Sequence, residues 1–137
     1  KLCKNMKDFY KKIYIEINKL LNNTDTLLLE KIAKSLINVN KKKKKVIIFG
    51  NGGSAAISSH VSIDLTKNAK IRSINFNEAD LLTCFSNDYG YEKVFSKSLE
   101  FYADVGDVVI IISASGKSKN LLEAAKICKK KKFYFIH

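Results

Sequence analysis

Apolar residues recur at helical spacing through the first 40 positions of the chain. One stripe is formed by Met6, Phe9, Ile13, Ile17 and Leu20, and a second by Leu28, Leu29, Ile32, Leu36 and Val39. Residues 22–25 (Asn-Asn-Thr-Asp) interrupt the repeat and supply a helix N-cap. The pattern predicts two amphipathic helices over residues 4–39, whose apolar faces either pack on the rest of the chain or contact another subunit.

From residue 46 onward, short runs of β-branched residues alternate with helical spacing. Strands are expected at residues 46–49, 71–76, 108–112 and 133–136, and helices at about 54–67, 78–86, 91–103 and 118–131. This succession predicts an α/β fold with a parallel sheet. We expect a single domain over residues 1–137, with N-terminal helices at 1–40 and an α/β core at 46–137. Because no helical pattern follows the last strand, we also expect the C-terminal part of the fold to be missing.

The composition is that of an ordinary globular domain, since 46% of the 137 residues are hydrophobic and 28% are charged. No apolar stretch approaches the roughly 20 residues that span a bilayer, and the lysine-rich N-terminus lacks a signal-peptide core. We therefore expect a cytoplasmic protein that makes no membrane contact. Cys3, Cys84 and Cys128 are scattered and form no Cys-x-x-Cys pair, so we expect buried small hydrophobes rather than disulfides or thiolate metal ligands.

A formal net charge of +12 is compatible with nucleic-acid binding. The lysine runs, however, lie at residues 41–45, before a strand, and at 129–132, where cations favour the carboxyl end of a helix. Arg72 is the only arginine, although arginine is the residue that best makes bidentate phosphate contacts. We therefore expect no nucleic-acid partner. The positive charge can still attract anionic substrates in a general way.

Two loops rich in glycine and serine carry the strongest functional signal. Residues 50–54 (Gly-Asn-Gly-Gly-Ser) follow the strand at 46–49, and residues 113–118 (Ser-Ala-Ser-Gly-Lys-Ser) follow the strand at 108–112. Each loop can point backbone N–H groups outward, and each precedes a helix whose positive end faces it. Because the carboxyl ends of parallel strands meet at one edge of a sheet, we expect one compact phosphorylated ligand to touch both loops.

Two nucleotide-binding motifs fit the loops less well than a sugar-phosphate site does. Residues 50–55 satisfy the loose dinucleotide pattern G-x-G-x-x-A, but Glu78 lies only approximately where that fold holds a ribose, and the second loop has no role there. Residues 116–118 (Gly-Lys-Ser) are similar to the close of a Walker A loop, yet Ile111 stands where that motif requires its first glycine. We therefore expect no nucleotide cofactor.

Polar residues in and after the two loops offer candidate chemistry. His60 and Asp64 stand four apart on the helix after the first loop, so they share a face as a metal pair or an acid–base pair does, although a surface hydrogen bond has the same spacing. Ser113, Ser115 and Ser118 offer three hydroxyls to a phosphate. Ser115 or Ser118 can equally be a simple N-cap of the next helix.

Residues 87–90 (Asn-Asp-Tyr-Gly) are, on their own, typical of a turn with a helix cap. Together with the two loops and the helix that carries His60 and Asp64, in this order, they make the chain resemble the sugar isomerase (SIS) family, and within it the phosphoheptose isomerases. The resemblance runs from the N-terminal helices to residue 137. It implies a three-layer αβα sandwich of the flavodoxin-like Rossmann type. It also implies a homotetramer built on the N-terminal helices, with active sites shared between neighbouring subunits.

The resemblance further implies roles for individual residues. Phosphate-binding positions of the family match Ser113, Ser115 and Ser118, and other substrate-binding positions match Asn51, Gly52, Gly53, Ser54, Asn87, Asp88 and Ala114. The position of His60 is a zinc ligand in the family, and that of Asp64 is a glutamate that touches both metal and substrate, so both are candidate catalytic residues and candidate Zn²⁺ ligands. These groups suit the conversion of sedoheptulose 7-phosphate to D-glycero-D-manno-heptose 7-phosphate through an enediol, in lipopolysaccharide or capsule synthesis.

The chain also departs from the family pattern. Asp64 replaces the usual glutamate and withdraws the carboxylate by about one methylene, which matters where catalytic geometry is tight. Ala114 replaces a residue that is often threonine. The family's glutamine and histidine, which are further zinc ligands, fall beyond residue 137. The alternative function is a non-catalytic SIS module, either a sensor that binds sugar phosphate or an adaptor that binds a protein partner.

Overall fold

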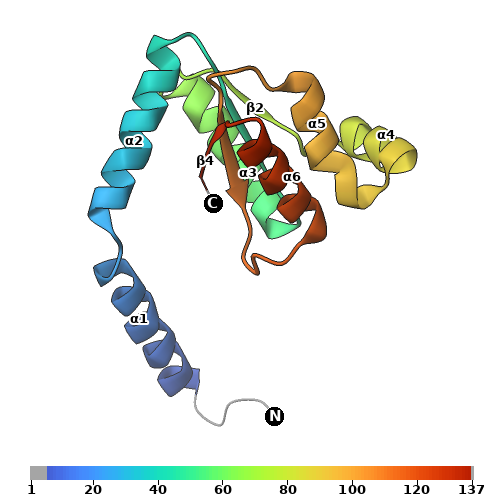
Figure 1. Ribbon diagram of the computed structural model, residues 1–137. Helices are drawn as coiled ribbons and strands as arrows, with labels where there is room; N and C mark the ends of the chain where they lie inside the picture. The colour runs from blue at the N-terminus through green and yellow to red at the C-terminus, as the bar shows by residue number, and fades with distance from the viewer. Residues whose placement is uncertain (1–5, 137) are drawn as a thin grey trace. The chain divides into compact units, whose positions relative to one another are not determined.

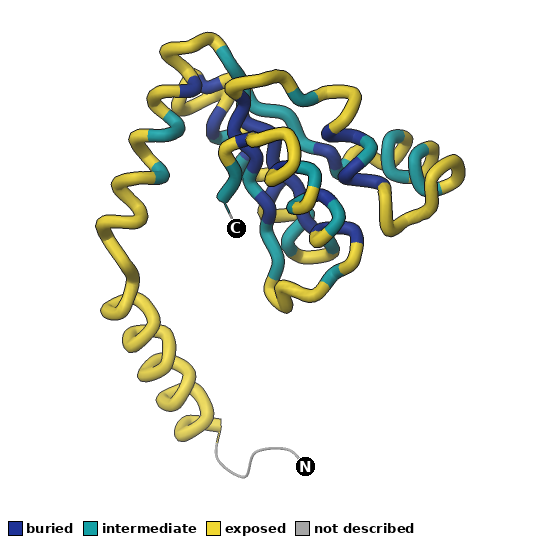
Figure 2. The backbone as a smooth tube through the Cα atoms, in the orientation of Figure 1, coloured by how far each residue is buried: buried dark blue, intermediate teal, exposed yellow. Residues whose placement is uncertain are grey.

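The computed structural model describes residues 6–136. They fall into two compact units, one ending at Lys31 and the other beginning at Ile32. The first unit holds α1 (Met6–Asn22) and the first turns of α2 (Thr26–Lys41). The interruption lies where the sequence predicted it, because the backbone N–H of Leu28 donates to Asp25 Oδ1 at 3.0 Å and so caps α2. No residue of α1 is buried, as Figure 2 shows along the whole helix.

The second unit contains the parallel sheet, whose strand order within the described residues is β2-β1-β3-β4 (Figure 1). The strands are β1 (Val46–Gly50), β2 (Ser73–Asn75), β3 (Val108–Ile112) and β4 (Tyr134–Ile136). The connecting helices are α3 (Gly53–Lys67), α4 (Ala79–Tyr89), the short 3₁₀ helix η1 (Tyr91–Lys93), α5 (Val94–Tyr102) and α6 (Lys119–Lys130). The predicted α/β succession is therefore confirmed.

Side chains alternate along the strands and fill two apolar clusters, one on each face of the sheet. On one face, Phe49 of β1 stacks on Phe95 of α5 with ring centroids 4.6 Å apart. On the other, Val46 of β1 packs with Leu65 of α3 and with Val39 from the carboxyl end of α2. Burying a side chain such as Phe49 contributes about 2–3 kcal/mol. The result is the three-layer αβα arrangement that the family resemblance implied, with buried residues in the sheet and on the helices packed against it (Figure 2).

Three local expectations differ from the structure. The strand predicted at 71–76 pairs with β1 only through the three residues of β2, because this is an edge strand and Ile71 N–H instead donates to Leu65 O at 2.8 Å. Residues 87–89 form the last turn of α4 rather than a turn, and Gly90 ends the helix at φ 82°. Cys128 is buried as expected, but Cys84 is exposed on α4, and Cys3 lies outside the described residues.

An ion cluster joins the amino ends of β1 and β3, at the edge opposite the two loops. Lys45 Nζ lies 2.6 Å from Asp107 Oδ2 and 2.7 Å from Asp104 Oδ2, and Asp107 is buried. Asp107 also accepts hydrogen bonds from the backbone N–H groups of Lys45 and Asp104. Burial lowers the pKa of Lys45, but the hydrogen bonds and charges of the two carboxylates outweigh it and raise the pKa above 10.5. None of the helices in residues 6–136 has the length and apolarity that a membrane crossing requires.

Candidate functional site

A cavity of about 200 Å³ lies at the carboxyl edge of the sheet, where β1 and β3 end side by side. Its lining residues come from both loops and from the strand and helix that flank the second: Asn51, Ser54, Ile112, Ser113, Ala114, Ser115, Ser118 and Leu121. The backbone pairing of Gly50 with Ile112 sets the loops at the same level of the sheet. The two segments that the sequence analysis singled out therefore line one cavity.

The first loop turns sharply at two glycines. A Cβ on Gly50 would lie 2.7 Å from the carbonyl oxygen of Ile112 and 2.7 Å from Ser54 Cβ, so only glycine fits this close approach. Gly52 has φ 55°, in the region that glycine adopts at low cost, and α3 begins at the next residue. Asn77 holds the loop from the β2 side, because its Nδ2 donates to Gly50 O at 2.7 Å and its Oδ1 accepts from Gly50 N at 3.2 Å.

The second loop is shaped by its own serines. Ser113 Oγ accepts from the backbone N–H of Gly116 at 3.0 Å, and Ser115 Oγ accepts from that of Lys117 at 3.2 Å. Because both hydroxyls act as acceptors in these bonds, their protons stay available to donate to an anion. Ser118 occupies the N-cap position of α6 but makes no side-chain capping bond. Capping therefore does not account for these serines.

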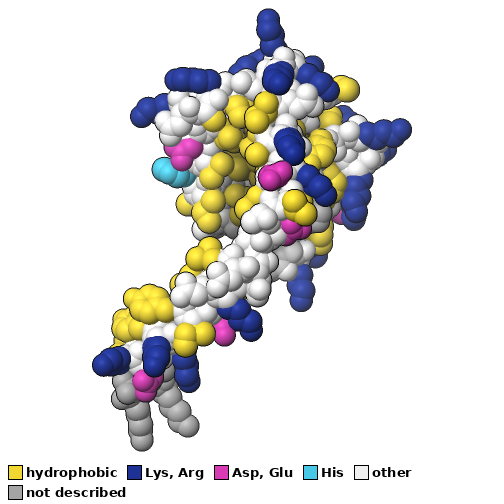
Figure 3. Space-filling view, turned by 90° about the vertical axis from the view of Figure 1, so that its left-hand side faces the viewer, with side chains coloured by type: hydrophobic (Ala, Val, Ile, Leu, Met, Phe, Trp, Pro, Cys, Tyr) yellow, Lys and Arg dark blue, Asp and Glu magenta, His cyan; other side chains and the backbone are white. Residues whose placement is uncertain are grey.

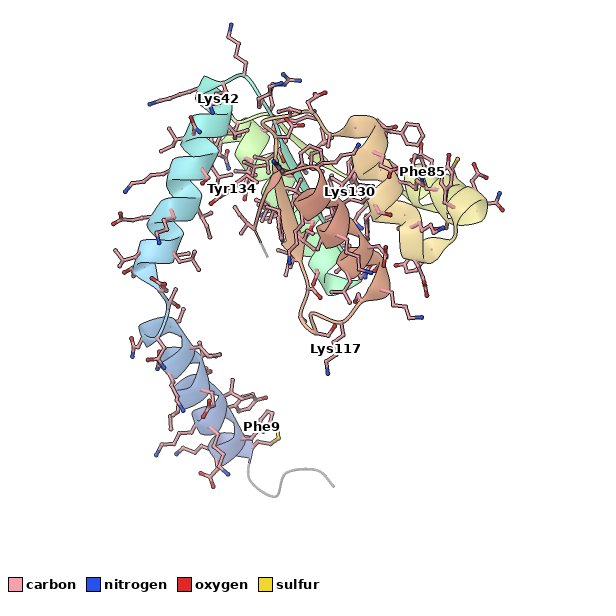
Figure 4. The ribbon with its side chains drawn as sticks, in the orientation of Figure 1. Phe9, Lys42, Phe85, Lys117, Lys130 and Tyr134 are labelled. Carbon is pink, nitrogen blue, oxygen red and sulfur yellow. The ribbon has the colours of Figure 1, made fainter. Side chains whose placement is uncertain are left out.

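The loops favour an anion through the dipoles of the backbone rather than through charged side chains. The cavity lies at the amino ends of α3 and α6, where the positive ends of the two helix dipoles favour an anion. Lys117 points away from the second loop into solvent (Figure 4). Lys119 Nζ pairs with Glu92 Oε1 at 2.9 Å, and this hydrogen bond raises the lysine pKa. On the face in Figure 3 the basic side chains are spread over several parts of the surface.

His60 and Asp64 lie together on α3, but the cavity is not lined by either of them. His60 Nε2 stands 3.3 Å from Asp64 Oδ2, and the two side chains are 79% and 49% exposed. Asn68 Nδ2 also donates to Asp64 Oδ1 at 3.0 Å. Within residues 6–136, no third histidine, cysteine or acidic residue joins them to form a metal-binding group. The pair offers two donors of the kind zinc accepts, short of the three or four that zinc takes from a protein.

Several other candidate residues also lie outside the lining of this cavity. Gly52 and Gly53 are exposed at the start of α3. Asn87 and Asp88 are exposed in the last turn of α4, where Asn87 Nδ2 donates to Asp88 Oδ1 at 3.0 Å. Their predicted contacts with a substrate stay predictions.

Three residues that support the site were not foreseen from the sequence. Asn77 clamps the backbone of Gly50, whereas Asn120 and Tyr91 both hydrogen-bond to the side chain of Asn51. Asn120 lies only two residues after Ser118, and it is 3% exposed although its amide is polar. A buried amide such as that of Asn120 needs a hydrogen-bonding partner. The sequence does not indicate that partner, because Asn51 lies 69 positions away along the chain.

Fold and cavity together define a class: an α/β protein in which the loops after two neighbouring parallel strands line one cavity. The sequence profile of the SIS domain family matches residues 8–136, so the chain belongs to the SIS domain family. The resemblance inferred from the motifs is thereby confirmed.

Individual relatives are phosphoheptose isomerases. The chain is 39% identical over 124 residues to a probable phosphoheptose isomerase of Thermoplasma volcanium, covering 85% of this chain and 63% of that protein. It is 38% identical over 135 residues to the phosphoheptose isomerase of Campylobacter concisus, covering 94% and 69%. Among solved structures, phosphoheptose isomerase GmhA from Neisseria gonorrhoeae superposes with a TM-score of 0.84 at 27% identity, over 96% of this chain and 74% of that chain. The chain is thus homologous to phosphoheptose isomerases over most of its length, and it spans between about half and about two thirds of the length of the curated relatives it matches.

Proposed function

We propose that the protein is a phosphosugar isomerase that converts sedoheptulose 7-phosphate to D-glycero-D-manno-heptose 7-phosphate. The observation that carries this proposal is the single cavity lined by Asn51 from one loop and the serines of the other. A sugar phosphate carries an anionic group and a chain of hydroxyls, and the cavity offers donors for both. The name of the relatives, phosphoheptose isomerase, supports the choice of sugar. We place the reaction in the cytoplasmic synthesis of surface polysaccharide as part of the same proposal.

In this proposal the phosphate is bound by the second loop. Ser113, Ser115 and Ser118 direct hydroxyl protons and neighbouring backbone N–H groups toward it, at the amino end of α6. Asn51 and Ser54 in the opposite wall contact the sugar. Such fixed donors need no rearrangement when the ligand binds, which reduces the free-energy cost of binding.

The proposed chemistry is a proton transfer between adjacent carbons. A base removes a proton from C1 of the ketose to form an enediol, a proton is returned to C2, and the O1 proton moves to O2, so that no atom is gained or lost. Asp64 and His60 are the proposed acid–base pair, because His60 Nε2 and Asp64 Oδ2 lie 3.3 Å apart on the helix that begins at the first loop. The shorter arm of Asp64 is expected to affect the rate.

Zinc and a second subunit belong to the same proposal. Zinc, when bound, would polarise the substrate carbonyl, and His60 and Asp64 would supply two of its ligands. A homotetramer built on the N-terminal helices would bring residues of neighbouring subunits, such as Asn87 and Asp88, toward each cavity. The exposed apolar side chains of α1 support an oligomer.

The test is an isomerase assay with sedoheptulose 7-phosphate, together with calorimetric binding of that sugar phosphate. Ser115→Ala is expected to weaken binding about tenfold, because it removes a hydrogen bond to a charged group. Ser35→Ala is the matched control, since Ser35 lies on α2 beside residues 105–108 at the opposite end of β3. Binding without turnover would favour the sensor alternative. Equal affinity in Ser115→Ala and the wild type would contradict the assignment of the phosphate loop.

A further inference from the structure

A network of three side chains joins the first loop to α6 and to η1 beside the cavity. Asn51 Nδ2 donates to Asn120 Oδ1 at 2.9 Å, and Asn120 Nδ2 donates back to Asn51 Oδ1 at 3.0 Å. The hydroxyl of Tyr91 in η1 donates to the same Oδ1 of Asn51 at 3.0 Å. The first loop, the start of α6 and η1 are therefore tied together at one amide.

A backbone contact fixes which way both amides are turned. The backbone N–H of Leu121 donates to Asn120 Oδ1 at 3.0 Å, and a peptide N–H can only donate. This oxygen is therefore the acceptor end of Asn120, and the Asn120 nitrogen faces Asn51 Oδ1. Asn51 must then direct its own nitrogen toward Asn120 Oδ1. The orientation of the Asn51 amide is therefore set by Asn120, which does not line the cavity.

The hydrogen-bonding capacity of Asn51 is then nearly used up inside the protein. An amide oxygen accepts two hydrogen bonds, and those of Asn51 come from Asn120 and Tyr91. Of its two Nδ2 protons, one is donated to Asn120. One N–H remains, on a residue that lines the cavity. Asn51 can therefore donate one hydrogen bond to a ligand but has no strong acceptor left for it.

We infer that Asn120 and Tyr91 are positioning residues that hold Asn51 as a single-proton donor to an oxygen of the sugar. This inference rests on the proposed function and deepens it. It names the ligand group that Asn51 selects, an oxygen acceptor such as a carbonyl or hydroxyl oxygen. A tie of this kind pre-organises the donor before the ligand arrives.

Calorimetry on the full chain tests the role of Tyr91. We expect Tyr91→Phe to weaken binding of sedoheptulose 7-phosphate about fivefold and to leave inorganic phosphate binding within about twofold, because only the sugar contact depends on Asn51. Tyr91 is 56% exposed, so the variant is expected to fold. Tyr89→Phe is the matched control, since Tyr89 is an exposed tyrosine two positions away whose ring faces Lys97. Equal affinity for the sugar phosphate in Tyr91→Phe and the wild type would overturn the inference.

A double-mutant cycle separates positioning from a merely structural role. If Tyr91 acts through Asn51, Tyr91→Phe has no further effect on sugar-phosphate binding in the Asn51→Ala background. If Tyr91 only packs η1 against the protein, the loss is the same in both backgrounds, and the inference is wrong. Asn120→Asp tests the other partner, because it keeps the acceptor for Leu121 and removes the donor to Asn51.

A measurement without ligand distinguishes failure of this inference from failure of the proposed function. In ¹⁵N NMR spectra, the Asn51 side-chain signals are identified by their loss in Asn51→Ala. We expect them to shift in Tyr91→Phe and to stay in place in Tyr89→Phe. If they shift but the wild-type chain binds no sugar phosphate, the proposed function is wrong and the positioning of Asn51 is supported. If they do not shift, the inference is overturned whatever the ligand.

Discussion

Gly50 has the tightest surroundings of the glycines in the two loops. Its missing Cβ is the reason that β1 can end against the carbonyl oxygen of Ile112 while α3 starts at once on the other side. Gly53, three positions later, has open space around it and a backbone that any residue can adopt. The two glycines of this short motif therefore have different physical roles: Gly50 permits close packing, whereas the space beside Gly53 would also accommodate a side chain.

This difference predicts opposite effects of the same substitution. Gly50→Ala is expected to lower the free energy of unfolding by about 1–3 kcal/mol, because the new methyl group overlaps backbone and must displace the loop. Gly53→Ala is expected to be neutral or to stabilise by up to about 1 kcal/mol, since alanine favours a helix start and restricts the unfolded chain. Urea denaturation of both variants measures the difference, and a Gly50→Ala protein as stable as Gly53→Ala would contradict the steric argument.

At the scale of elements, an ion cluster stabilises the amino edge of the sheet, whereas hydrogen bonds of side-chain amides stabilise the carboxyl edge. Lys45 ties β1 to the loop before β3 through Asp104 and Asp107. Asn77 and Asn120 tie the opposite ends through neutral hydrogen bonds. Because the charges lie at the far end of the strands, the cluster stabilises the sheet without placing a carboxylate next to the proposed phosphate site.

Lys45→Met is expected to destabilise the protein by about 2–3 kcal/mol at neutral pH, because it leaves the buried Asp107 carboxylate with backbone donors alone. The pKa of Lys45 is raised in the folded state, so its contribution is full below 10.5 and is lost as the pH rises through the folded pKa. The hydrogen bond from Lys45 lowers the pKa of Asp104 below 3.8, so that contribution is present above 3.8 and is lost in acid.

The check is thermal or urea unfolding of Lys45→Met and the wild type across the pH range. The difference in the free energy of unfolding between the two proteins is expected to be largest at neutral pH and to decrease in acid and in alkali. Lys42→Met is the control, since Lys42 is an exposed lysine just after the end of α2. A difference in stability that stays constant from acid to alkaline pH would show that Lys45 stabilises the protein through packing of its aliphatic stem and not through its charge.

The sequence predicted those elements whose local pattern and tertiary packing agree. β1, β3 and the loops after them were correct because buried parallel strands are continuous apolar runs that end in glycine or serine. The edge strand β2 was overestimated, because Ile71 and Phe76 are apolar for packing rather than for pairing. The bonds from Tyr91 and Asn120 to Asn51 could not be predicted, since polar pairing over such distances leaves no periodic trace in the chain.

At the scale of the whole molecule, the N-terminal unit exposes an apolar stripe that nothing within that unit covers. Ile13, Ile17 and Leu20 are 37%, 47% and 69% exposed, and apolar side chains also gather on the surface of this unit in Figure 3. A contiguous apolar face on a helix is typical of an interface between chains. This is the feature of the structure that supports the proposed homo-oligomer.

Ile17→Asp is expected to reduce the mass of the oligomer, because a carboxylate buried in an apolar interface loses its hydration without gaining a partner. Light scattering after size-exclusion chromatography measures the mass. Lys11→Asp is the control, since it adds a carboxylate to the same helix at a position that is already charged. A wild-type protein that is monomeric at all concentrations would contradict the oligomer, as would an Ile17→Asp protein of unchanged mass.

The pairing of Gly50 with Ile112 has a consequence for how the protein acquires its site during folding. Helices form from neighbours in sequence, whereas β1 and β3 must meet across the intervening α3, β2, α4 and α5. The cavity exists only after that long-range step, so no partly folded chain with local helices alone can hold the proposed sugar phosphate between both loops. Ligand binding would therefore report the pairing of β1 with β3, and a phosphorylated sugar would act as a kinetic probe of that step.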